Sequence, residues 1–219
     1  MGKGAKSERS ISEKAKNMIV NLEIGSEELY KQRYENPIWP ESDSGITIGI
    51  GYDLGYADKA YLHRDWDNLI ASNEIDVLEG VLGLKGRKAK NALPSVKNEV
   101  KVTWEAASAQ FKEFLPYVVS QTEKTFRHTK LLNDHCMGAL VSLVYNRGTN
   151  LSLNNDKRSE MRAIYDLMNA KKFSEIPMNI RSMKRLWEGN PKAQGLVKRR
   201  ELEARLFEIG LSEQAVHSR

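Results

Sequence analysis

The chain has 219 residues, of which 40% are hydrophobic and 29% are charged. This balance is typical of a folded globular protein and excludes a disordered chain, and the length suffices for one sizeable domain or one domain with two lobes. The net charge is +5 and the pI is about 9.1. A basic chain favours encounter with an anionic partner such as nucleic acid or an anionic cell envelope, although a solvated basic surface fits the same numbers.

Cysteine and histidine usage argues against metal and disulfide chemistry. Cys136 is the only cysteine, which excludes an internal disulfide and a thiolate cluster. It lies in the apolar run HCMGALVSLVY, which predicts a buried free thiol. The four histidines have no spacing typical of paired metal ligands. We therefore expect neither a metal nor a cofactor.

The sequence also constrains where the protein acts. No window approaches about 18 uninterrupted apolar residues, so we expect no membrane-spanning helix. The first residues, MGKGAKSERSISEK, have neither an apolar core nor a cleavage site, so they predict no secretory signal. We expect synthesis in a bacterial cytoplasm.

Helix signals come first in the chain. Residues 1–10 predict a flexible polar tail. Residues 11–24 predict a helix, because apolar side chains recur at helical spacing, Ser10 and Glu13 match a capping box, and Gly25 is a natural stop. Residues 30–45 hold two prolines and little periodicity, which predicts a loop. Residues 46–52 alternate as in a strand.

The rest of the chain predicts helices. They are expected over residues 67–72, 74–84, 104–115, 134–145, 157–169 and 191–208, with Thr103 capping the third and Pro116 ending or kinking it. Residues 134–145 are apolar nearly all round, which predicts a central buried helix. With no repeat or linker, we expect one α+β domain over residues 11–219. It would have a small β-containing lobe over about 25–72 and a helical lobe over about 73–210.

SGITIGIGYDLGY, residues 44–56, combines strand-like alternation with four glycines. In a strand, the three isoleucines would point into a core, while Thr47, Gly49 and Gly51 would line the other face. Glycine weakens a strand, and close approach of a ligand to the main chain is one reason to accept this cost. A bulge or a tight hairpin is the alternative. Full extension would separate Thr47 from Asp53 by about 20 Å, so joint action requires a bend, which the glycines permit.

Glu23 lies at the edge of the apolar stripe of the first predicted helix, in its last turn. The negative end of the helix dipole and partial burial both disfavour an ionised carboxylate there. A carboxyl group that keeps its proton is what a general acid needs. A buried, hydrogen-bonded glutamate without a catalytic role is the alternative.

These motifs together resemble the phage lysozyme family, the family 24 type of glycoside hydrolases. That family has a glutamate at the end of its first helix, a tyrosine seven residues on, and T-I-G-x-G. Here these are Glu23 in NLEIGSEELY, Tyr30, and Thr47 in TIGIGYD. The sequence is most similar to the branch that includes pesticin, which has WP, a short turn and SG-[VI]-TIGIGYDLGY. ALVSLVYNRG and GLVKRRELEARLF resemble the central and closing helices of the family.

The resemblance implies a lysozyme-like fold and a muramidase that hydrolyses the β-1,4 bond between N-acetylmuramic acid and N-acetylglucosamine. Glu23 would be the general acid, while Thr47 and an aspartate would hold the water, with inversion. In the pesticin-like branch the aspartate follows the threonine by six residues, which is Asp53. Asp43 and Glu41, which precede the threonine as in the commonest phage members, are the alternatives.

Substrate contacts are expected beside these residues. The predicted substrate-binding set comprises Trp39, Gly49, Gly51 and Tyr52, with a loop anchor as the alternative for Trp39. The basic residues of the last predicted helix are expected on a solvated face, with wall polymers as the alternative partner. These residues are Lys198, Arg199, Arg200 and Arg205.

Partner and setting follow from the same resemblance. We expect peptidoglycan glycan strands as the partner, neither nucleic acid nor stable membrane insertion, and a monomer. A phage endolysin released through a holin and an injected antibacterial effector both fit. The alternative functions are a glycan-binding module that has lost catalysis and a lytic transglycosylase.

Overall fold

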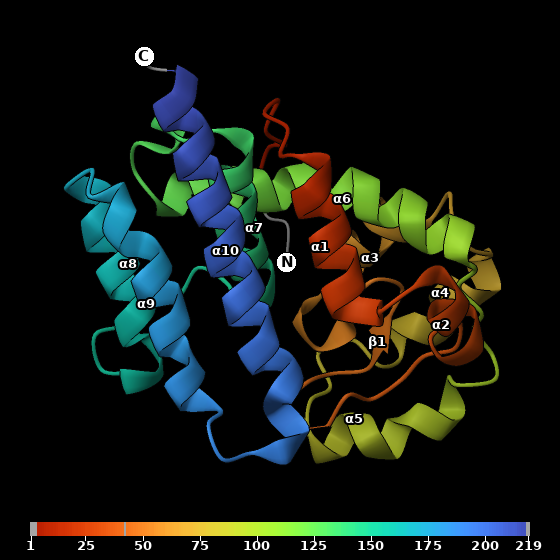
Figure 1. Ribbon diagram of the computed structural model, residues 1–219. Coiled ribbons are helices and arrows are strands. Elements are labelled where there is room, and N and C mark those ends of the chain that lie inside the picture. The colour runs from red at the N-terminus through yellow and green to blue at the C-terminus, as the bar shows by residue number, and fades with distance from the viewer. Residues whose placement is uncertain (1–3, 42, 218–219) are drawn as a thin grey trace. The chain divides into compact units, whose positions relative to one another are not determined.

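The computed structural model describes residues 4–41 and 43–217 (Figure 1). These residues form two compact units, one of residues 23–115 and the other of residues 4–22 with 116–217. We call them the hairpin unit and the helical unit. The division falls within two helices, α1 (Glu13–Ile24) and α6 (Trp104–Thr125). Residues 1–3 of the predicted tail lie outside the described residues.

The hairpin unit contains the only strands among the described residues. They form a two-stranded antiparallel sheet, in which Thr47 lies opposite Asp53 and Ile48 lies opposite Tyr52. Besides the ends of α1 and α6, its elements are α2 (Glu27–Arg33), β1 (Thr47–Ile48), β2 (Tyr52–Asp53), α3 (Lys59–Trp66), α4 (Ser72–Glu79) and α5 (Arg87–Ala92). The mostly helical α+β class is as expected.

The prediction of one continuous strand over residues 46–52 is wrong, and its alternative, a tight hairpin, is what the structure contains. Gly49 and Gly51 have φ angles of +56° and +74°, which reverse the chain between β1 and β2. The expected bend between Thr47 and Asp53 is therefore present. The three isoleucines of this stretch are fully buried as predicted, and they anchor the hairpin in the core of its unit.

The helical unit is built around α7 (Asp134–Arg147), in which every residue from Cys136 to Val144 is buried. Its other elements are α8 (Ser159–Asn169), α9 (Ile176–Ser182) and α10 (Gln194–His217), and α10 packs along α7 (Figure 1). The predicted central buried helix is confirmed. The free thiol of Cys136 is buried as predicted, and burial raises its pKa to about 12, which keeps it protonated and unreactive.

Local signals predicted some helix ends correctly and others incorrectly. Gly25, with φ of +81°, ends α1, and the Thr103 hydroxyl accepts the Ala106 N–H at 3.2 Å at the start of α6. The cap of α1 is Ser12 rather than Ser10, since its hydroxyl accepts the Ala15 N–H at 3.2 Å. Pro116 does not end α6, which continues to Thr125. The helices α2, α3, α5 and α9 were not predicted, and the helix expected over residues 67–72 is a turn between α3 and α4.

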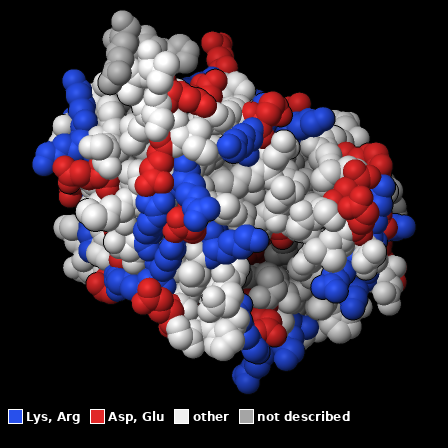
Figure 2. All heavy atoms as spheres, viewed as in Figure 1, with Lys and Arg blue, Asp and Glu red and all other residues white. Residues whose placement is uncertain are grey.

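The charged residues of α10 do not share one environment. The prediction of a solvated basic face is wrong for Arg199 and Arg200, which are buried against the fully buried Glu203. Farther out, acidic and basic side chains intermingle over α9 and α10 (Figure 2), where Arg181 contacts both Glu201 and Glu208. The outward charges of this face therefore largely neutralise one another.

His63 joins α3 to α4 through two carboxylates. Its Nδ1 lies 2.7 Å from Asp67 Oδ1, and its Nε2 lies 2.7 Å from Glu79 Oε1. Hydrogen bonds to Glu79 and then Asp67 raise the pKa of His63. The protonated ring therefore stabilises the folded state, and this contribution is complete at pH values below about 6.5, the pKa of histidine in an unfolded chain. This stability is lost as the pH rises through the folded pKa.

His63→Gln is therefore expected to destabilise the protein more in acid than in base. The measurement is the difference in thermal unfolding midpoint between wild type and variant at about pH 5.5 and about pH 9. An equal difference at both pH values would contradict the ionic role of His63.

Among the described helices, none combines the length and apolar character that crossing a bilayer requires. Within residues 4–41 and 43–217, no cluster of His, Cys, Asp or Glu side chains is arranged to hold a metal ion.

Candidate functional site

Glu23 ends α1 directly beside the turn of the hairpin. A Cβ atom built on Gly51 would lie 2.9 Å from Glu23 Oε2 and 3.3 Å from its Cδ. The carboxyl group thus occupies the space that a side chain at position 51 would fill. The structure therefore brings Glu23 and Gly51 together.

Thr47 and Asp53 face each other across the hairpin. Residues directly opposite in an antiparallel pair project from the same face, so the two side chains lie on one side of the sheet. Thr47 is also held from its other edge, where its N–H donates to the Ile38 carbonyl at 2.8 Å and its carbonyl accepts the Ile38 N–H at 3.0 Å. Both backbone hydrogen-bonding groups of Thr47 are therefore held by Ile38, and its side chain remains half-buried.

The Asp53 carboxylate is oriented by the backbone. Its Oδ1 accepts the N–H of Gly55 at 2.8 Å and that of Gly45 at 3.0 Å. Burial raises the pKa of Asp53, and the two N–H donors and the nearby Lys85 ammonium partly oppose this rise. One carboxylate oxygen therefore holds the loop, while the other, Oδ2, accepts no hydrogen bond from the described residues.

The glycines at positions 45 and 55 make this arrangement possible; from the sequence, Gly55 was expected only to permit a bend, and Gly45 was given no role. A Cβ atom on Gly45 would lie 2.3 Å from the Gly55 nitrogen and 2.4 Å from Asp53 Oδ1. Both glycines flank the TIGIGYD motif, so the signal was present in their spacing. Their function is to let two backbone segments close around the carboxylate.

Two predicted substrate-binding residues have a different role in the structure. Tyr52 is 2% exposed, donates its hydroxyl to Asp65 Oδ2 at 3.0 Å, and packs edge-on against Trp66. A Cβ atom on Gly49 would lie 2.7 Å from the Trp66 ring. Both residues therefore face the core behind the hairpin, and the prediction that they contact substrate is corrected. Trp66 was predicted to be a packing residue, and its partners could not be read from the sequence.

Trp39 is fixed to its own loop and lies beside a lysine. Its indole N–H donates to the Ser44 carbonyl at 3.1 Å, and the Lys90 ammonium lies 5.5 Å from its ring centre. This supports the loop-anchor alternative. Asp43 and Glu41, the alternative carboxylates, are both exposed, and Ser42 between them lies outside the described residues.

Gly51→Ala is expected to lower any activity that depends on Glu23 by about tenfold or more, because misplacement of a catalytic group by about 1 Å has effects of this size. The new Cβ atom would displace the carboxyl group, and alanine is strained at a φ of +74°. The measurement is kcat/KM on peptidoglycan.

Gly83→Ala is the matched control for this prediction. Gly83 has nearly the same φ, +72°, but open space where its Cβ atom would lie. It therefore carries the same backbone strain without the collision. An equal loss of activity in both variants would contradict a specific contact between positions 51 and 23.

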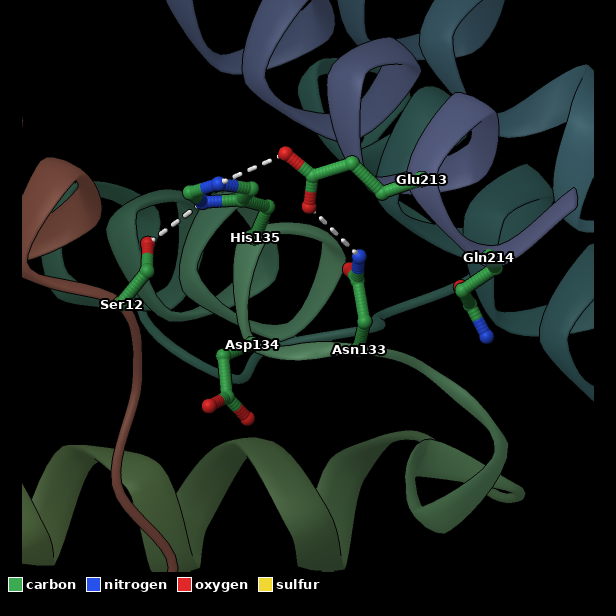
Figure 3. Close-up of a pocket in the computed structure, with 6 residues that line it drawn as sticks. All are labelled: Ser12, Asn133, Asp134, His135, Glu213 and Gln214. Atoms are coloured by element: carbon green, nitrogen blue, oxygen red, sulfur yellow. Dashed lines mark hydrogen bonds and ion pairs between the residues drawn. The ribbon is translucent and has the colours of Figure 1, made fainter. Parts of the chain in front are cut away.

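A separate pocket of about 440 Å³ lies in the helical unit (Figure 3). It contains no residue of the predicted site. Ser12 and Asn133 cap α1 and α7, and the ring of His135 lies 2.7 Å from the Ser12 hydroxyl and 3.4 Å from a carboxylate oxygen of Glu213. The pocket is therefore lined by groups that join helix ends.

Two sequence families match the chain. The profile of the phage lysozyme family matches residues 83–203, and that of a domain of unknown function, DUF8812, matches residues 19–136. The second match contains Glu23, Thr47 and Asp53, whereas the first begins after them. No curated protein gives a significant match. Each family match covers more than half of the 219 residues, so the chain carries DUF8812 and belongs to the phage lysozyme family.

Proposed function

We propose that the protein is a muramidase that hydrolyses the β-1,4 bond between N-acetylmuramic acid and N-acetylglucosamine in peptidoglycan. The family suggests a peptidoglycan-degrading glycoside hydrolase of the lysozyme type. One observation carries the finer assignment. The Glu23 carboxyl group abuts Gly51, in the turn that joins the strands of Thr47 and Asp53.

In the proposed mechanism, Glu23 protonates the glycosidic oxygen of the leaving sugar. The Thr47 hydroxyl and Asp53 Oδ2 hold a water molecule on the opposite face of the ring, and Asp53 accepts a proton as this water attacks. The product has inverted configuration, for which carboxyl groups about 6.5–9.5 Å apart leave room for the water. The two N–H donors on Asp53 Oδ1 support this role by holding the carboxylate still.

Asp53 is favoured over Asp43 and Glu41 because it is held in place. A catalytic carboxylate must be positioned by its surroundings, and the hydrogen bonds of Gly45 and Gly55 do this for Asp53. Asp43 and Glu41 are exposed, and neither accepts a hydrogen bond from any described residue. Gly51 remains a proposed contact at the site, and Trp39 a proposed contact at its edge.

Mass spectrometry of fragments released from purified sacculi tests this function. Hydrolysis at muramic acid leaves a reducing end, which is the expected product. Anhydromuramic ends would instead identify a lytic transglycosylase, and bound but uncut sacculi would identify a glycan-binding module. Kinship to the pesticin-like branch, a monomeric state, and release through a holin or by injection stay predictions.

A further inference from the structure

One segment of the sequence holds the whole excess of basic over acidic residues. Residues 80–98 contain five basic residues and no acidic residue. Since the chain has 34 basic and 29 acidic residues, these five account for the whole net charge of +5. All five are exposed, and we call them the α5 patch: Lys85, Arg87, Lys88, Lys90 and Lys97.

The α5 patch is distinguished by five exposed cations that gather in one segment without any acidic residue. Within the described part of the chain, none of the five forms an ion pair. Around α9 and α10, by contrast, several cations are matched by carboxylates: Arg181 of α9 and Lys184, which follows α9, both pair with Glu201 of α10. In Figure 2 basic side chains project at the lower edge of the view, where α5 lies in Figure 1. An unneutralised group of like charges attracts an external polyanion.

The α5 patch adjoins the proposed catalytic hairpin within the same unit. The N–H of Gly86 donates to the Ser44 carbonyl at 2.9 Å, and that of Gly83 donates to the Leu54 carbonyl at 3.0 Å. Ser44 directly precedes Gly45, whose N–H donates to Asp53, and Leu54 directly follows Asp53. The segment that carries the patch is thus hydrogen-bonded to both sides of the loop that holds this carboxylate.

Two aromatic rings lie between the patch and this loop. The Lys85 ammonium lies 3.5 Å from the ring centre of Tyr56, which is 55% exposed, and the Lys90 ammonium lies over Trp39. Cations above aromatic faces keep their charge while their position is restricted. The patch therefore presents localised charge beside the site.

We propose that the α5 patch binds a phosphate-rich polymer of the bacterial cell envelope while the adjoining hairpin engages the glycan strand. This inference rests on the proposed function, because it takes the hairpin to bind a glycan strand of the same envelope that carries the phosphate-rich polymer. Four of the five cations are lysines, which act as point charges and suit a flexible polyanion better than bidentate recognition. The six-residue α5 is too short to act as the long basic recognition helix of many nucleic-acid binders, so DNA is treated as a competitor in the test.

The test compares two triple variants with equal net charge. The patch variant removes three charges of the α5 patch that contact neither Trp39 nor Tyr56. Its substitutions are Arg87→Gln, Lys88→Gln and Lys97→Gln. The control variant removes three exposed charges outside the α5 patch. Its substitutions are Lys112→Gln, Lys192→Gln and Lys198→Gln. Both are made in a Glu23→Gln background, and co-sedimentation with sacculi is measured directly as binding.

The probes are Gram-positive sacculi that retain their phosphodiester polymers and the same sacculi stripped of them by hydrofluoric acid. The patch variant is expected to bind phosphate-bearing sacculi about tenfold more weakly than the control variant at low salt. The difference should vanish on stripped sacculi and at about 0.5 M salt, where charges are screened within a few ångströms.

Two results would overturn the proposal. The first is equal binding of both triple variants to phosphate-bearing sacculi. The second is selective loss of binding to a DNA duplex at matched phosphate concentration, with sacculus binding unchanged. Because the readout is binding, a failure here is distinguishable from a failure of the muramidase assignment, which is decided by the released fragments.

Discussion

Glu23→Gln is expected to lower the rate of peptidoglycan hydrolysis by on the order of 10²-fold or more. The amide has nearly the shape of the carboxyl group and still fits beside Gly51, but it cannot give a proton to the leaving oxygen. The rate is measured as release of reducing ends from sacculi, and circular dichroism verifies the fold. Binding of sacculi should change little, because the substitution removes an interaction made in the transition state.

Glu13→Gln is the matched control for this substitution. It makes the same chemical change at the opposite end of α1, where the exposed Glu13 contacts only Lys16 among the ion pairs of the described residues. We expect its activity to stay within about twofold of wild type, since surface ion pairs contribute little. A folded Glu23→Gln protein with full lytic activity would show that another group supplies the proton.

Glu203→Gln is expected to lower the free energy of unfolding by about 3–5 kcal/mol, the usual cost of leaving buried charges without their partner. Glu203 is fully buried, and its carboxylate contacts Arg199 Nε at 3.1 Å and Arg200 Nε at 2.9 Å. Its Oε1 also accepts the Ser142 hydroxyl at 2.7 Å. The amide would take the negative charge of Glu203 away from two buried guanidinium groups.

Urea unfolding measures this effect, and Glu208→Gln is its control on the same helix. Glu208 pairs with Arg181 at the surface, where loss of an ion pair costs about 1 kcal/mol or less. Since a protein of this kind is stabilised by only about 5–15 kcal/mol, the two outcomes are easily separated. Equal losses in both variants would mean that the buried triad contributes no more than a surface pair.

The two substitutions separate chemistry from folding. Glu23 lies in the hairpin unit and Glu203 in the helical unit, and each is examined through a different observable. Loss of turnover with retained stability is expected for the first, and loss of stability for the second. A variant of Glu203 that folds at low temperature should retain an intact hairpin.

Several elements followed from local sequence patterns alone. The apolar run around Cys136 predicted a buried helix, because only a helix surrounded by protein can be apolar on every face. Gly25 predicted the end of α1, since it readily adopts the positive φ of a helix C-terminus. The resemblance around Glu23 and Thr47 predicted the family, and the family match confirmed that assignment.

The roles of Gly49, Tyr52, Arg199 and Arg200 depended on tertiary structure. In the sequence, Gly49 and Gly51 are equivalent glycines of one motif, yet Trp66 fills the space beside the first and Glu23 the space beside the second. Arg199 and Arg200 follow Lys198 as a basic run, but their charges are balanced in the core by Glu203. Local conformation is determined by neighbours in the chain, which a sequence displays. Whether a side chain meets solvent, substrate or core is determined by residues far away in the chain, which only the folded structure brings together.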